Sequence, residues 1–76
     1  MILELTSLQK EGGDKITVVI PATTPMVIDR VVNTAGEVIG TRLVISGLGT
    51  VICQEAYESV ISRIQKDMGM GRAYVN

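Results

Sequence analysis

The sequence predicts a small α+β fold: an antiparallel β-sheet or partly closed barrel of four to five strands, followed by one C-terminal helix. Two observations predict it. Residues 2–53 are short, largely β-branched segments separated by turns rich in glycine, asparagine and proline, a pattern typical of strands joined by hairpins. After Glu55 the apolar residues adopt helical spacing. With 76 residues the chain has room for one domain, a β-meander plus helix at residues 1–69, with 70–76 as a C-terminal tail.

The first two strands are predicted at residues 2–8 and 15–20. In the first, Leu3 and Leu5 alternate with polar residues, as in a half-buried strand. The two glycines at 12 and 13 favour a hairpin between the strands. Residues 21–25 contain two prolines, which disfavour helix in the preceding residue and so predict a connector.

Three further strands are predicted at residues 26–32, 38–46 and 50–53. Glycine-containing turns at 33–36 and 47–49 separate them. The sequence leaves open whether 50–53 is a separate strand or the end of a bent one.

The helix is predicted at residues 55–68, with glutamates near its start, Lys66 near its end and Gly69 to terminate it. Its apolar stripe, widened by Val60, consists of Tyr57, Ile61, Ile64 and Met68. This stripe is expected to face the core or another subunit.

Composition restricts the function. The chain has no histidine, one cysteine (Cys53) and 46% hydrophobic residues. These counts argue against an intrachain disulfide, a metal site of the usual kind, a cofactor and most enzymes. A net charge of −1 and 3% aromatic residues argue against nucleic-acid binding. A mean hydropathy of +0.35 is high for a small monomer and favours a homo-oligomer.

The sequence also indicates a compartment. The N-terminal residues lack the basic region of a signal peptide. No segment approaches the roughly 20 apolar residues of a membrane span. We therefore expect a cytoplasmic protein without a membrane partner.

Three groups of residues could carry chemistry, and each also has a structural explanation. Cys53 is a thiol at a strand–helix junction, expected to be buried. Glu55 and Glu58 are paired carboxylates at a helix start, where the helix dipole alone favours them. Gly47 and Gly49 resemble a phosphate-binding loop but precede a strand, which favours a hairpin turn.

Arg30 and Arg42 lie within predicted strands among apolar residues. They could protect a sheet edge, or form ion pairs with Asp29 or Glu37. In a symmetric oligomer they could instead form a basic pocket for an anionic small molecule. The predicted binding residues are Arg30, Thr41, Arg42, Gly47 and Gly49. The predicted oligomer interface consists of Tyr57, Ile61, Ile64, Met68 and Tyr74, of which Tyr74 would anchor the tail on a neighbour.

Laid out in this way, the chain resembles the small FlbD-type flagellar proteins and their short phage-encoded relatives, which open with Met-Ile-x-Leu-Thr-x-Leu. The matching stretches are residues 3–8, 15–18, 25–31 and 51–61. The chain departs from the family pattern at Ala56, where a serine is expected, and in a more apolar hairpin around Leu48. The resemblance implies a fold, names no catalytic residue, and is compatible with a phage origin.

The first functional hypothesis is a non-enzymatic, homo-oligomeric interaction module that binds a host protein or builds an assembly. The second is an oligomer that sequesters an anionic nucleotide signal through arginines at its subunit interfaces. A nucleic-acid regulator is a weaker third option.

Overall fold

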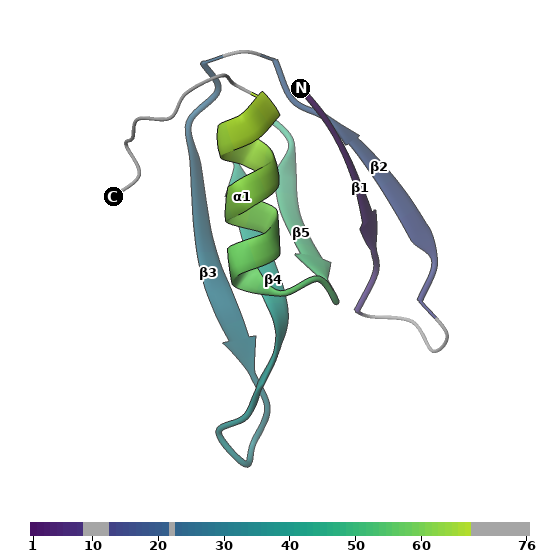
Figure 1. The fold of residues 1–76 in the computed structure, drawn as a ribbon, viewed down its shortest axis with the longest axis vertical. Helices are drawn as coiled ribbons and strands as arrows, with labels where there is room; N and C mark the ends of the chain where they lie inside the picture. Colours follow the sequence, from purple (N-terminus) through teal and green to yellow (C-terminus); the bar gives the residue numbers. More distant parts are fainter. Residues whose placement is uncertain (9–12, 22, 68–76) are drawn as a thin grey trace.

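The computed structural model describes residues 1–8, 13–21 and 23–67. Within these residues, five antiparallel strands form two sheets, and one helix follows them (Figure 1). The elements are β1 (Ile2–Thr6), β2 (Lys15–Val19), β3 (Met26–Val32), β4 (Val38–Ile45), β5 (Gly49–Cys53) and α1 (Tyr57–Asp67). The α+β prediction is confirmed. The described strands do not close into a barrel, and residues 49–53 are a separate strand.

The two-stranded sheet is the β1–β2 hairpin. Leu3 pairs with Val18 and Leu5 with Ile16, and these apolar residues turn toward the core, with Leu3, Leu5 and Val18 buried. The other side of the hairpin faces solvent, where the paired Ile2 and Val19 are both exposed.

The three-stranded sheet has the order β3-β4-β5 and two distinct faces. Residues paired across neighbouring strands share a face, and successive residues alternate between faces. The inner face carries the row Ile28–Leu43–Val51, and Leu43 is completely buried. The opposite, outer face carries the row Asp29–Arg42–Ile52.

Helix α1 lies across the inner face (Figure 1). Its first main-chain bond runs from the Val60 N–H to the Ala56 carbonyl, at 3.0 Å. Val60 is completely buried and Ile64 packs against the core, whereas Tyr57 and Ile61 are half-buried. No helix in the described residues is long and apolar enough to cross a membrane.

The two sheets meet at one corner, where the end of β1 reaches the end of β5. Ser7 and Cys53 form an isolated antiparallel bridge. The Leu8 N–H donates to the Ile52 carbonyl at 3.1 Å, and the Gln54 N–H donates to the Thr6 carbonyl at 2.8 Å. Apart from this junction, the described β1 and β5 belong to different sheets.

Candidate functional site

The structure places the two strand arginines on opposite faces of one sheet. Arg30 pairs across strands with Thr41 on the inner face, and Arg42 pairs with Asp29 on the outer face. One chain therefore does not bring the two guanidinium groups together. The predicted pocket for an anion stays a prediction about an oligomer.

Gly47 lies in the β4–β5 turn and Gly49 begins β5, whereas Thr41 lies in the middle of β4. Gly47 and Gly49 have φ angles of 84° and 110°, which side-chain-bearing residues rarely adopt. The Leu48 N–H closes the turn by donating to the Ile45 carbonyl at 3.0 Å. The turn thus accounts for both glycines.

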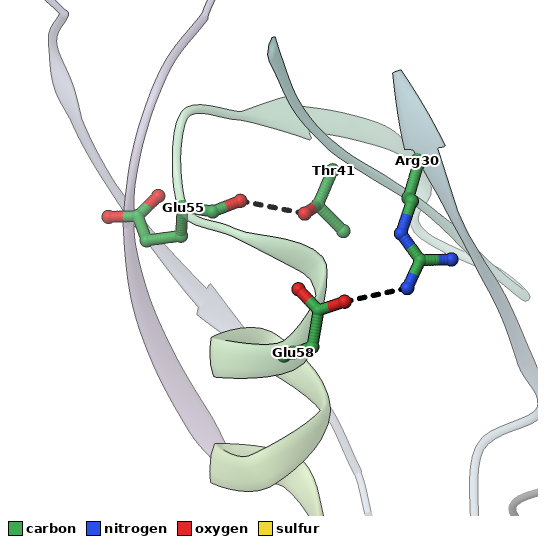
Figure 2. A network of polar contacts seen from close by, with 4 residues as sticks. All are labelled: Arg30, Thr41, Glu55 and Glu58. Carbon is green, nitrogen blue, oxygen red and sulfur yellow. Dashed lines mark hydrogen bonds and ion pairs between the residues drawn. The ribbon is translucent and has the colours of Figure 1, made fainter. Parts of the chain in front are cut away.

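Arg30 belongs to a polar cluster at the start of α1 (Figure 2). Its Nη2 donates to the Glu58 carboxylate at 2.7 Å, and its guanidinium lies 4.0 Å from the centre of the Tyr57 ring. The hydrogen bond from Arg30 holds the pKa of Glu58 below its usual value. Because both charged side chains are largely exposed, the pair adds little to stability.

Thr41 and Glu55 hold the strand–helix junction together (Figure 2). The buried Thr41 hydroxyl donates to the Glu55 carbonyl at 2.7 Å. The Glu55 carboxylate accepts from the Thr6 N–H at 2.9 Å and from the Thr6 hydroxyl at 3.0 Å. Burial by itself would raise the pKa of Glu55, but the hydrogen bonds outweigh it and lower the pKa. Glu55 therefore anchors the end of β1 to the segment that leads into α1.

The Cys53 side chain is buried in the core cluster that also contains Val60 of α1, with none of its surface exposed. Burial raises the pKa of its thiol. A reactive cysteine needs an accessible thiolate, so the structure gives Cys53 the properties of a core residue.

The outer face of β3-β4-β5 was not predicted as a site. At its centre the Arg42 Nε and Nη2 donate to the two Asp29 carboxylate oxygens at 3.0 and 2.5 Å. These hydrogen bonds lower the pKa of Asp29 and raise that of Arg42. Beside the pair, Val27 and Val44 are 62% and 40% exposed. The residues of this face are Val27, Asp29, Val31, Arg42, Val44, Thr50 and Ile52.

A hollow of about 620 Å³ lies between the β1–β2 hairpin and α1. The Arg63 side chain lines this hollow, and its Nη1 donates a hydrogen bond to the Glu4 carbonyl at 2.8 Å. Two basic and two acidic side chains line the hollow: Lys15, Arg63, Glu4 and Glu55. The lining has no charge excess that would select an anion.

Among the predicted interface residues, Tyr57, Ile61 and Ile64 lie on α1, and Met68 and Tyr74 lie outside the described residues. No group of three or more metal-ligating side chains occurs in the described part of the chain. The resemblance to FlbD-type proteins stays a prediction. When the chain is compared with protein-family models, with curated proteins and with solved structures, none of the three comparisons finds a match.

Proposed function

We propose that this protein is a non-enzymatic interaction module that functions by assembling with copies of itself. The outer face of β3-β4-β5 is the observation that carries the proposal. It is an apolar sheet face with a charge-neutral centre, and two of its valines, Val27 and Val44, remain exposed although α1 covers the opposite face.

The fold of one chain leaves two neighbouring valines of this face exposed. Val27 and Val44 are cross-strand partners and form one continuous apolar row. Removing apolar surface from water contributes about 25 cal/mol per Å², and adjoining exposed apolar residues commonly mark contact sites. Association would cover this row without disturbing the core.

The groups best suited to chemistry already have structural roles, which favours binding over catalysis. Cys53 is buried, and the carboxylate of Glu55 is held by Thr6. The hydroxyl of Thr41 is committed to the main chain of residue 55. Each of these groups stabilises the junction between the sheets.

No observation favours the alternative of an anion-binding oligomer. The guanidinium of Arg30 is bound to Glu58, and that of Arg42 is bound to both oxygens of Asp29. At either site a phosphate would have to approach a guanidinium whose charge is already neutralised by a carboxylate. We therefore retain the self-assembling module as the proposed function.

Sedimentation velocity over a wide concentration range tests this proposal. We expect the wild-type protein to form an oligomer and Val27→Glu to remain monomeric, because the new carboxylate would be buried without a partner. Val19→Glu is the matched control, since Val19 is 61% exposed and Val27 is 62% exposed, but Val19 lies on the other sheet.

A wild-type protein that stays monomeric at every concentration would contradict the proposal. An oligomer that persists in Val27→Glu but is lost in Val19→Glu would move the interface to the β1–β2 hairpin. Circular dichroism of both variants verifies that the fold is retained.

A further inference from the structure

We infer that the occupant of the outer face is a second copy of this chain, related by a two-fold axis that runs between the two facing sheets at the level of the Asp29–Arg42 pair. Arg42 of each copy then faces Asp29 of the other. This inference rests on the proposed function and specifies its partner and geometry.

Charge complementarity is the first argument. A two-fold interface brings one surface against itself, so that surface must be self-complementary. The outer face carries one carboxylate and one guanidinium side by side on neighbouring strands. A half-turn about an axis that lies between the two facing sheets, parallel to the strands and midway between the two residues, sets opposite charges against each other. The result is four alternating charges with no net charge.

The hydrogen-bonding capacity of the pair is the second argument. Arg42 uses two N–H groups on Asp29, and a guanidinium has five donors. The carboxylate likewise accepts more than the two bonds it receives here. A buried ion pair is tolerated when further hydrogen bonds satisfy its remaining groups, and a second copy would supply both types of group.

The position of the apolar row is the third argument. In the strand register, Val27 and Val44 lie on one side of the ion pair, and Val31 lies on the other. A two-fold axis that sets Arg42 over Asp29 runs parallel to the strands, so it keeps each residue at its position along the strand and sets Val27 of one copy over Val44 of the other. Both exposed valines of each chain would then lie against the partner sheet, at the face-to-face spacing of about 10 Å between packed sheets.

Charge reversal tests the geometry. Arg42→Glu makes the centre of the face wholly acidic, and Asp29→Arg makes it wholly basic. Because like charges would meet across the axis, each variant alone should self-associate about a hundredfold or more weakly than wild type. An equimolar mixture should form a one-to-one heterodimer, measured by native mass spectrometry and sedimentation velocity.

The double variant Asp29→Arg/Arg42→Asp sharpens the test. It should form homodimers, because the exchanged pair is again self-complementary. It should not exchange subunits with the wild type, because Arg would meet Arg and Asp would meet Asp. Lys15→Glu changes the charge as much as Arg42→Glu does, but lies on β2, and should leave the wild-type dimer intact.

The outcomes separate the two proposals. Free exchange between wild type and the double variant, or a normal dimer of Arg42→Glu, would overturn this geometry while the self-assembling function stands. A wild-type protein that is monomeric throughout would overturn both. Two results together would support the inferred axis. Wild type and the double variant would form separate homodimers when mixed, and the two single variants would form a heterodimer when mixed.

Discussion

The two faces of the β3-β4-β5 sheet differ although the same three strands build both. On the inner face, Leu43 and Ile45 are almost wholly buried beneath the helix. On the outer face, the intervening Arg42 and Val44 are exposed. Alternation along a strand thus assigns half of the side chains to folding and leaves the other half available for contacts outside the chain.

The largest contrast should come from truncating neighbouring residues of β4. Leu43→Ala removes a buried side chain and should lower the free energy of unfolding by about 2–5 kcal/mol. Val44→Ala should change it by less than about 1 kcal/mol, because Val44 is already 40% exposed. Urea denaturation measures both changes.

This measurement is best made in a Val27→Glu background, where association does not contribute to stability. Equal losses for the two variants would show that the outer face is covered within a single chain. That result would remove the distinction between the faces.

A second contrast compares two threonines of the same sheet. Thr41→Val keeps the side-chain shape but leaves the Glu55 carbonyl without the hydroxyl that donates to it. We expect a loss of about 1–3 kcal/mol. Thr50→Val on the outer face should change stability by less than about 0.5 kcal/mol. A stable Thr41→Val would show that this hydrogen bond does not secure the junction.

The smallest predicted effect is a pH dependence carried by Glu55. Its pKa is lowered from 4.5 in the folded protein, so the folded state favours the ionised carboxylate. The resulting stability is present above about pH 4.5 and is lost as the pH falls through the lower folded pKa. In Glu55→Gln, stability should vary less with pH over this acidic range.

Glu58→Gln is the control for that experiment. The pKa of Glu58 is also lowered, by Arg30, but its side chain is 74% exposed, where solvent screens the interaction. Chemical denaturation between pH 3 and 7 should therefore show a weaker effect than for Glu55. A wild-type slope retained in Glu55→Gln would assign the acid sensitivity to another group.

The order of the elements was predictable because it depends on local patterns. Every predicted strand and the helix are present with ends within two residues of the predicted positions. Period-two alternation, turn glycines and the change to helical spacing each act over a few residues. The helix stripe was less well placed, since Val60, predicted only to widen it, is the most buried of its described residues.

The candidate site was less predictable because it depends on register and on contacts distant in sequence. Sequence left the partners of Arg30 and Arg42 open. The strand register sets Asp29 beside Arg42, where the two form an ion pair. The packing of α1 against the sheet brings Glu58 to Arg30, and these form a second ion pair. The hydrogen bond between Thr6 and Glu55 spans 49 positions of the sequence, and no local sequence pattern predicts it. Because successive residues of a strand lie on opposite faces of a sheet, the sequence could have predicted that Thr41 and Arg42 do not share a face.

The junction between β1 and β5 has a consequence for the order of folding. Each hairpin joins strands that are close in sequence, whereas forming the Thr6–Glu55 contact requires the chain to close a loop of 49 positions. We expect the hairpins to form early and the junction to form late. In hydrogen exchange, the Leu8 and Gln54 amides, which cross the junction, should then lose protection together before the β4 amides do. The β1–β2 hairpin would thus open as one cooperative unit while the three-stranded sheet remains folded.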